Sequence, residues 1–293
     1  MKPLSSSLST PKPSPSPASR GASRWLLLPI AIVVAFLVGR GFSAFGPLAA
    51  TQNQVAVAPA TKRARELNFR VVASIPHDRA AFTEGLLWDD GGFYESNGME
   101  KHSNLRRIQY PSGKVLSQIQ MAPELFGEGL TLWRDQLIQL TYQTQRGFVY
   151  DRKTFRKVRE WNYQGEGWGL THDDRHLIMS NGSDILTYRD PDSFAIVRQL
   201  SVTLNGVPQR NLNELEWIGG RIWANIWQTD SVVVIDPTDG HIESYLNCAG
   251  LLPAAERTGR EDVLNGIAYD EKTKRIWLTG KYWPKIYEIK LEN

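Results

Sequence analysis

Short apolar runs separated by polar turns alternate along most of the chain, beginning near Leu67 and continuing to the C-terminus. The runs are rich in aromatic and β-branched residues, as at 93–96, 137–141 and 275–279. The segments between them carry Asp, Asn, Gly and Pro, which supply the backbone angles of tight turns. This pattern is typical of short β-strands joined by hairpins. It predicts an all-β domain over residues 67–293.

A short signature recurs just before the strand-like runs. It reads Phe-Thr-Glu-Gly-Leu at 82–86, Phe-Gly-Glu-Gly-Leu at 126–130 and Gly-Glu-Gly-Trp-Gly-Leu at 165–170, with weaker copies at 213–217 and 264–268. The copies are about 40 to 50 residues apart, and repeats of that length with four strands each are typical of β-propeller blades. The sequence therefore predicts a five-bladed β-propeller, with an irregular β-sandwich as the alternative.

The fifth repeat is shorter than the others, because residues 285–291 provide only one further strand. An unpaired outer strand would leave an open sheet edge that invites aggregation. Residues 68–76 precede the first signature and have the composition of a strand. We therefore expect this N-terminal strand to close the ring.

The N-terminal region differs in composition from the rest of the chain. Residues 1–24 form a basic tail rich in Ser and Pro, which predicts disorder. Residues 25–50 are apolar apart from Arg40 and predict one apolar helix, either a signal anchor or a cleaved signal peptide. We favour the anchor, with 51–66 as a linker. The basic flank predicts that the remainder is exported, so we expect a periplasmic or extracytoplasmic domain held at the membrane by its N-terminal segment.

Composition and charge narrow the function classes. The net charge of +3 is small for 293 residues and gives no reason to expect nucleic-acid binding. The single cysteine, Cys248, has no partner for an internal disulfide and is expected to be a buried thiol. We expect a monomer.

Candidate chemistry gathers in the signatures and at the ends of the second strands. Because the innermost strands of a propeller line its channel, these residues should converge on one channel mouth and form a pocket for a small polar substrate. Taken singly, Glu84, Glu166, Glu214 and Glu216 are expected to have a structural role, accepting backbone N–H bonds in turns between blades, and packing between blades is expected for Trp217, Trp223 and Trp277. The converging set comprises Glu84, Glu128, Glu166, Trp168, Asn213, Glu214, Glu216 and Asn265, together with Asn97, Gln143, Asn181, Asn225, Trp227, Gln228 and Lys281.

Several common catalytic motifs are missing from the sequence. It contains no Gly-x-Ser-x-Gly nucleophile elbow, no phosphate-binding Gly-Lys-Ser/Thr loop and no His-Glu-x-x-His zinc motif. His172 and His176 flank a predicted turn and are expected at the surface.

Taken together, the motifs resemble those of the plant and bacterial glutaminyl cyclases, the papaya-type glutaminyl-peptide cyclotransferases. The resemblance extends from about Phe69 to Leu291. It implies a five-bladed propeller that converts the N-terminal glutamine of peptides or proteins to pyroglutamate and releases ammonia. Its motifs are at 82–86, 94–98, 126–131, 167–170, 212–216, 223–229, 263–268 and 279–284.

The resemblance also implies roles for individual residues. Glu128 matches the proposed catalytic glutamate, which would shuttle the proton between the amine and the leaving nitrogen. Glu84 departs from the pattern, because plant members commonly carry glutamine there, and a second carboxylate would be able to hold the substrate ammonium. The remaining matches are the wall residues Phe82, Trp168 and Trp227 and the polar pocket residues Asn213 and Lys281.

No metal-ligand set like that of the zinc-dependent animal enzymes is visible in the sequence, so we expect a reaction without cofactor or metal. A structural Ca²⁺ in the channel stays an open alternative. Two other functions also stay open: a calcium-dependent lactonase using Glu84, Asn181 and Asn225, and a non-catalytic binding propeller at the cell surface.

Overall fold

The computed structural model describes residues 63–292. The tail at 1–24, the apolar segment at 25–50 and the linker up to residue 62 lie outside the described residues, and what the sequence predicts for them stays a prediction. Within 63–292 no helix has the length and apolar character needed to cross a membrane.

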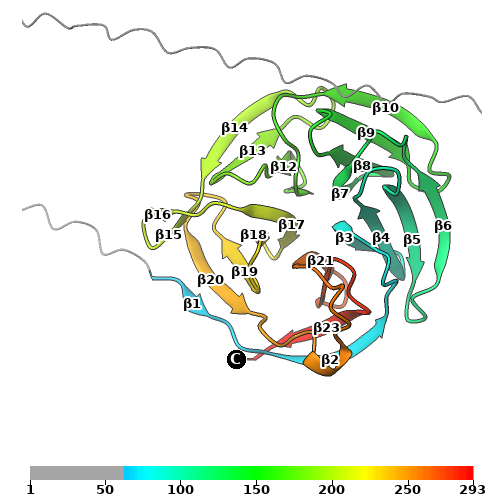
Figure 1. The fold of residues 1–293 in the computed structure, drawn as a ribbon. Helices are drawn as coiled ribbons and strands as arrows, with labels where there is room; N and C mark the ends of the chain where they lie inside the picture. Colours follow the sequence, from blue (N-terminus) through cyan, green and yellow to red (C-terminus); the bar gives the residue numbers. More distant parts are fainter. Residues whose placement is uncertain (1–62, 293) are drawn as a thin grey trace, which may run out of the picture. The chain divides into compact units, whose positions relative to one another are not determined.

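Five antiparallel sheets are arranged around a central channel, which confirms the predicted five-bladed propeller (Figure 1). The innermost strands β3, β7, β11, β17 and β21 contact one another in a closed cycle. The first sheet contains β3 (Thr83–Asp89), β4 (Gly92–Asn97), β5 (Asn104–Gln109) and β6 (Val115–Gln120). The second contains β7 (Gly127–Trp133), β8 (Gln136–Thr141), β9 (Arg146–Asp151) and β10 (Lys157–Asn162). The third contains β11 (Leu170–His172), β12 (Leu177–Met179), β13 (Ile185–Arg189) and β14 (Ile196–Ser201). The fourth contains β17 (Leu212–Ile218), β18 (Arg221–Ile226), β19 (Ser231–Ile235) and β20 (Ile242–Asn247).

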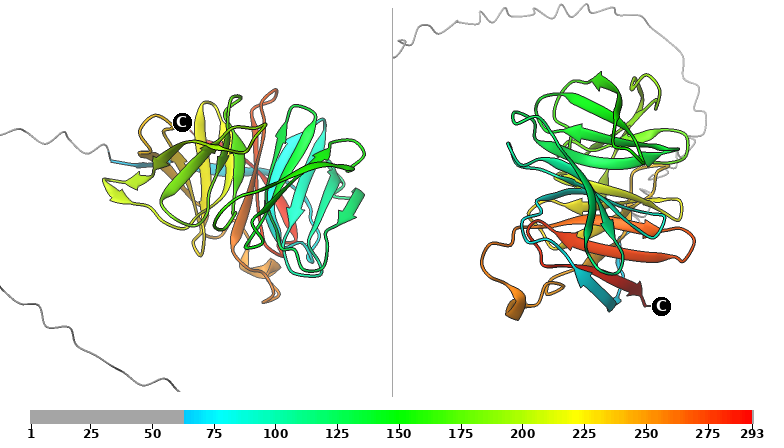
Figure 2. Two further views of the ribbon diagram at one scale, coloured as in Figure 1. Left: turned by 90° about the horizontal axis from the view of Figure 1, so that it is seen from above. Right: turned by 90° about the vertical axis from the view of Figure 1, so that its right-hand side faces the viewer.

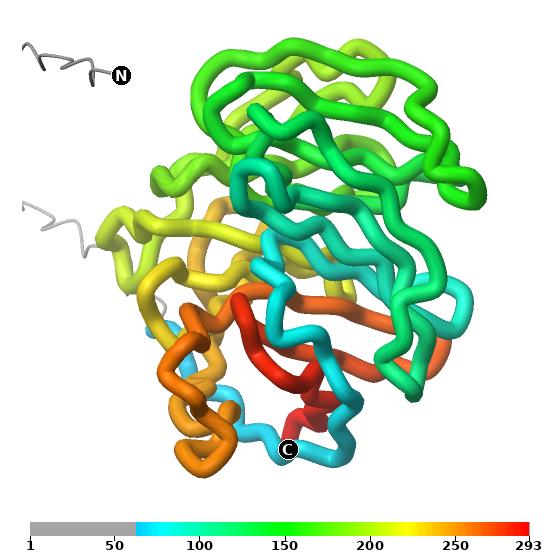
Figure 3. Tube along the Cα trace, turned by 45° about the vertical axis from the view of Figure 1, so that its right-hand side comes forward, coloured from blue at the N-terminus to red at the C-terminus, as the bar shows by residue number. Residues whose placement is uncertain are grey.

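The fifth sheet is built from both ends of the domain. It contains β21 (Leu264–Asp270), β22 (Arg275–Gly280), β23 (Lys285–Leu291) and, outermost, β2 (Phe69–Pro76). The two terminal strands pair antiparallel from Phe69 opposite Leu291 to Pro76 opposite Lys285, and they lie side by side in Figure 3. This pairing satisfies the backbone groups of β23 that would otherwise form an open edge.

Three short elements have no counterpart in the sequence prediction. β1 (Arg65–Glu66) pairs parallel with β20, at the end of the predicted linker. The hairpin of β15 (Thr203–Leu204) and β16 (Val207–Pro208) precedes β17. The 3₁₀-helix η1 (Ala254–Glu256) lies in the connection to β21, which extends beyond the neighbouring strands (Figure 2).

The hydrophobic core consists of five clusters, one between each pair of neighbouring sheets. The middle strands are therefore buried on both faces, as in β8, whereas an outer strand such as β14 is mostly exposed. Trp223 and Trp277 lie between blades as expected, and the ring of Trp277 stacks on Trp88 with centroids 4.4 Å apart. Each sheet is thus stabilised mainly by apolar burial against its neighbours.

Around the channel the innermost strands approach one another closely. A Cβ atom on Gly85 would lie 2.6 Å from the backbone nitrogen of Leu130, and one on Gly129 would lie 2.6 Å from the carbonyl carbon of Gly169. Only glycine allows backbones to approach this closely. The glycines of the signature therefore let adjacent sheets pack backbone to backbone at the channel.

Candidate active site

β-Bulges direct the signature side chains toward the channel. The pairing register shifts between Thr83 and Gly85 in β3 and between Gly127 and Leu130 in β7, and similar shifts occur in β17 and β21. A bulge places an extra residue in one strand, bends that strand and re-aims a side chain. The sequence prediction placed the signature residues before the inner strands, but in these four sheets the acid or amide lies within the bulged strand itself. The side chains at equivalent positions are Glu84, Glu128, Asn213 and Asn265, with Trp168 preceding β11 in the third sheet.

One mouth of the channel contains a cavity of about 220 Å³. All seven residues predicted for the site line it, although they come from all five repeats. Its lining comprises Phe82, Glu84, Phe126, Glu128, Tyr142, Trp168, Asn213, Trp227, Asp262 and Lys281.

The prediction missed three lining residues, Phe126, Tyr142 and Asp262. Phe126 stands four residues before Leu130, as Phe82 does before Leu86, so the repeat itself carried a signal for it. Tyr142 follows the second strand of its blade. Asp262 lies in the long connection before β21, where the repeat has no counterpart.

Aromatic side chains form the walls of the cavity. The indoles of Trp168 and Trp227 meet edge to face, with ring centroids 5.6 Å apart and planes at 79°. The Trp168 indole N–H donates a hydrogen bond of 3.0 Å to Glu166, which also accepts a 2.9 Å bond from the side chain of Gln143. Glu166 thereby fixes the orientation of the Trp168 indole. The edge-to-face arrangement of the two indoles is a favourable geometry for an aromatic pair.

Glu84 and Lys281 form a buried ion pair on the opposite side. The Lys281 ammonium donates to the Glu84 carboxylate over 2.6 Å, and the Asn265 amide lies 3.3 Å from the other carboxylate oxygen. The ammonium also lies 4.3 Å from the centre of the Phe82 ring, close enough for a cation–π contact. Burial raises the pKa of Glu84 to about 7, although the charge of Lys281 opposes the increase.

Glu128 has a different environment although it occupies the equivalent position in the next blade. Its side chain is buried, and its carboxylate forms no hydrogen bond or ion pair with any side chain in the range 63–292. Burial raises the pKa of Glu128 well above its usual value, the negative charges of Glu84 and Glu166 raise it further, and Lys281 opposes them. A carboxyl group with a raised pKa is a better proton acceptor than an ordinary carboxylate, and this one faces the cavity without a competing partner.

Other residues of the predicted converging set serve the fold instead. Glu214 is buried in the channel and accepts backbone N–H bonds from Leu86 at 3.2 Å and Ile267 at 2.9 Å. Glu216 accepts the N–H of Tyr269 and lines a separate cavity. Asn225 accepts the N–H of Gly266, and Asn181 bonds within its own turn. Glu214 and Glu216 thus accept backbone N–H bonds, the structural role expected for them, whereas the expected convergence of Asn181 and Asn225 on the mouth was wrong, because hydrogen bonds to nearby groups hold them elsewhere.

Among residues 63–292, no group of three or more His, Cys, Asp or Glu side chains is arranged to hold a metal ion. The Lys281 ammonium, 2.6 Å from Glu84, supplies the positive charge that balances this carboxylate. The arrangement is suited to proton transfer and to hydrogen bonding with a polar substrate.

Comparison with known proteins agrees with this geometry. Residues 44–291 match the family model described as glutamine cyclotransferase. A glutaminyl-peptide cyclotransferase of Arabidopsis thaliana is 36% identical over 274 residues, which cover 92% of this chain and 83% of that protein. The crystal structure of Myxococcus xanthus glutaminyl cyclase matches with a TM-score of 0.74 at 34% identity, covering 78% of this chain and 99% of that chain. The chain therefore belongs to the glutamine cyclotransferase family.

Proposed function

We propose that the protein is a glutaminyl-peptide cyclotransferase, which converts the N-terminal glutamine of peptides or proteins to pyroglutamate and releases ammonia. The observation that carries the proposal is the buried Glu128 carboxyl, which faces an aromatic pocket without a hydrogen-bond partner in the described chain. Its raised pKa suits a group that must both accept and donate a proton.

The pocket has the groups needed to hold a folded-back glutamine side chain. The indoles of Trp168 and Trp227 provide apolar walls, and Asn213 offers an amide to the γ-amide of the substrate. Holding the amine against its own γ-carbonyl gives the reaction the advantage of proximity. The substrate ammonium would lie near the Glu84 and Glu128 carboxylates.

In the proposed reaction, Glu128 takes a proton from the substrate α-amine as the nitrogen attacks the carbonyl carbon of the γ-amide. This attack forms the ring C–N bond and a tetrahedral oxyanion, which Lys281 and Asn213 are placed to stabilise. Glu128 then returns the proton to the nitrogen of the γ-amide, and the bond between that nitrogen and the carbonyl carbon breaks. One ammonia leaves, and Glu128 regains its starting protonation state.

The reaction moves an acyl group from one nitrogen to another within a single substrate and transfers protons through Glu128, so it requires neither an oxidant nor a second reactant. We propose on this ground that it proceeds without a cofactor, and a structural Ca²⁺ in the channel would be compatible with it. The proposal includes a monomeric enzyme. It also includes an exported, extracytoplasmic location with a membrane anchor, supported by the basic flank and apolar run of residues 25–50.

The decisive experiment incubates the purified protein with a Gln-initiated dipeptide and follows the product by mass spectrometry. We expect the loss of one ammonia per peptide and its appearance in solution, with no change to the matching Asn-initiated dipeptide. A folded protein that releases no ammonia would refute the proposal. Chelator-sensitive hydrolysis of a lactone in its place would support the calcium-dependent alternative.

A further inference from the structure

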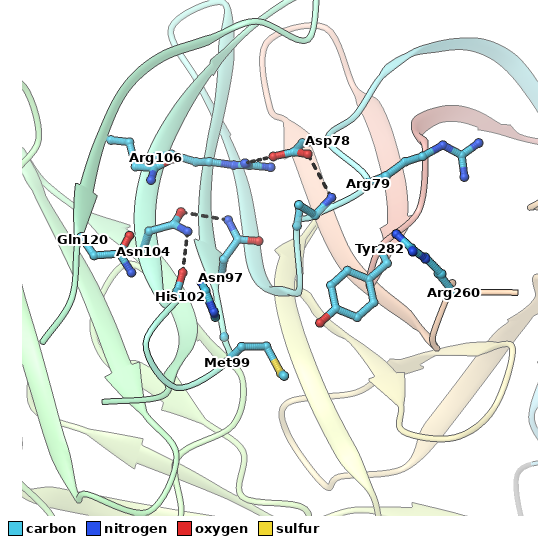
Figure 4. A pocket seen from close by; sticks show the side chains of 14 residues that line it. Asp78, Arg79, Asn97, Met99, His102, Asn104, Arg106, Gln120, Arg260 and Tyr282 are labelled. Atoms are coloured by element: carbon cyan, nitrogen blue, oxygen red, sulfur yellow. Dashed lines mark hydrogen bonds and ion pairs between the residues drawn. The ribbon is translucent and has the colours of Figure 1, made fainter. Parts of the chain in front are cut away.

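A second and larger cavity lies next to the aromatic pocket. It has a volume of about 640 Å³, within the range of ligand sites, and Figure 4 shows its lining. The cavity lies between the first sheet and the connections on either side of the fifth.

Phe82 and Tyr282 form part of the ridge between the two cavities. Phe82 lines the aromatic pocket, Tyr282 lines the larger cavity, and their ring centroids are 5.1 Å apart. The residues that precede these two in the chain line the opposite cavities. Ala81, before Phe82, lines the larger cavity, and Lys281, before Tyr282, lines the smaller one. A peptide with its first residue in the aromatic pocket can therefore continue directly over this ridge.

One wall of the larger cavity contains two polar atoms without partners. The Asn97 side chain is 2% exposed and points into the cavity, with its nitrogen turned toward Asn104 (Figure 4). Its Oδ1 atom has no hydrogen-bond donor among residues 63–292. The Nη2 atom of Arg106, which is 3% exposed, has no acceptor in the same range. One atom is an unused acceptor and the other an unused donor, the kinds of group that pair with the N–H and C=O groups of a peptide backbone, and burying such atoms unpaired is unfavourable.

The charges around the cavity are unequal. Arg106 pairs with Glu95 at 2.6 Å and with Asp78 at 2.9 Å, and Arg79 pairs with Glu261 at 2.7 Å. Arg260 lies at the exposed rim near Tyr282 and forms no ion pair within the described part of the chain. Among the charged lining residues of the described chain, Arg260 is thus the one whose charge has no ion-pair partner.

We propose that this cavity binds the residues that follow the N-terminal glutamine of a peptide substrate and favours an acidic side chain among them. Asn97 and Arg106 bind the peptide backbone, and Arg260 attracts a carboxylate at the second or third position. The inference rests on the proposed cyclotransferase function and adds the preferred class of substrate.

The test compares kcat/KM for glutamine amide with that for three families of tripeptide amides. Each begins with glutamine and carries Glu, Ala or Lys at the second or third position. We expect the Ala peptides to exceed glutamine amide about fivefold, because the backbone gains hydrogen bonds in the cavity. At low salt we expect the Glu peptides to exceed the Ala peptides about threefold and the Lys peptides to fall below them.

The variant Arg260→Gln should abolish the preference for Glu over Ala, and Arg260→Glu should reverse it in favour of Lys. The matched control is Arg70→Gln, which removes an equal charge from the exposed face of β2 and should keep the wild-type ratios. Equal rates for all tripeptides and glutamine amide would overturn the inference while leaving the cyclotransferase function intact, as would a Glu preference that survives Arg260→Gln. If glutamine amide and every peptide remained unreacted, the proposed function would fail and the inference with it.

Discussion

At the scale of single residues, two glutamates at equivalent positions of neighbouring blades have different hydrogen-bond and ion-pair partners. Glu84 is held by Lys281 and Asn265, whereas Glu128 keeps its carboxylate unpaired toward the cavity. Environments that separate two carboxyl groups in this way commonly assign them different roles. We assign proton transfer to Glu128 and charge balance to Glu84.

Replacing Glu128 with Gln tests the first role. Glutamine has nearly the same shape but cannot accept a proton, so kcat for ammonia release should fall by about 10²- to 10⁴-fold. Circular dichroism should show an unchanged fold. The control Glu124→Gln alters an exposed acid close in sequence and should leave turnover unaffected. Near-normal turnover by folded Glu128→Gln would remove this residue from the mechanism.

Replacing Glu84 with Gln should shift the pH dependence of kcat/KM. The acidic limb follows Glu128, which must be ionised to act as a base, and the pKa of Glu128 is raised first by burial and then by the charge of Glu84. Removing that charge lowers the pKa, so the acidic limb should move to lower pH.

A pH–rate profile of the free enzyme against a Gln-initiated dipeptide measures this shift. Glu84→Asp keeps the charge and should keep the limb close to its original position. A limb that stays in place or moves to higher pH in Glu84→Gln would contradict the coupling between the two acids.

The residues of the site were more predictable than their partners. The repeated signature indicated Glu84 and Glu128, because its spacing places both at the channel. It gave no indication that Lys281, 197 residues from Glu84, would neutralise it, since a single sequence shows no contact between distant segments. Asp262 was missed for a similar reason, because its connection has no repeat to align.

At the scale of elements, one buried acid holds the inner part of the first blade together. Glu95 on β4 accepts hydrogen bonds from Arg106 on β5 at 2.6 Å and from Thr83 on β3 at 2.6 Å. It also lies 2.8 Å from the ring nitrogen of His77, which follows β2. Burial alone would raise the pKa of Glu95, but the charges of Arg106 and His77 outweigh burial and hold the pKa well below its usual value.

The variant Glu95→Gln should reduce the free energy of unfolding by about 3–5 kcal/mol at neutral pH, because the buried Arg106 loses its main counter-charge. Urea denaturation measures the change. An acid with a lowered folded-state pKa contributes stability above its unfolded pKa, and that contribution is lost as the pH falls through the folded value. The difference between wild type and variant should therefore shrink in strong acid.

The comparison variant is Glu160→Gln in the exposed pair between Glu160 and Arg146, and it should change stability little. Equal losses from the two substitutions would show that burial of Glu95 adds nothing to its contribution.

Strands were predictable where they form part of the repeated pattern. The second strands of all five blades lie where their composition placed them, as β8 and β22 show. The two-residue strands β1, β15 and β16 were not predictable, because such short segments carry no periodicity. The bulges were also hidden, since an extra residue in a glycine-containing signature leaves no distinctive mark on composition.

At the scale of the whole molecule, the ring depends on the pairing between its first long strand and its last. Ile75 of β2 is buried in the cluster between the fifth and first sheets, together with Ile286 of β23. Loss of β2 would remove this packing and expose the edge of β23.

A chain that begins at residue 67 should therefore fold and remain active, because among the described residues it loses only the short pairing of β1 and the contacts of Ala64. A chain that begins at residue 77 should be unfolded or aggregated, because it lacks β2 entirely. Size-exclusion chromatography and ammonia release from a Gln-initiated dipeptide distinguish the two. An active, monomeric chain beginning at 77 would show that ring closure is dispensable.

The close backbone contacts at the signature glycines determine how the protein loses activity on heating. Gly85 and Gly129 let neighbouring strands meet backbone against backbone, so the opening beside Glu128 is framed by direct contacts between the inner strands. Its width is set by the full circle of blades, and a catalytic geometry defined in this way has no local hinge. On heating, turnover should persist until the circle itself opens, and inactivation should coincide with the single loss of tertiary structure.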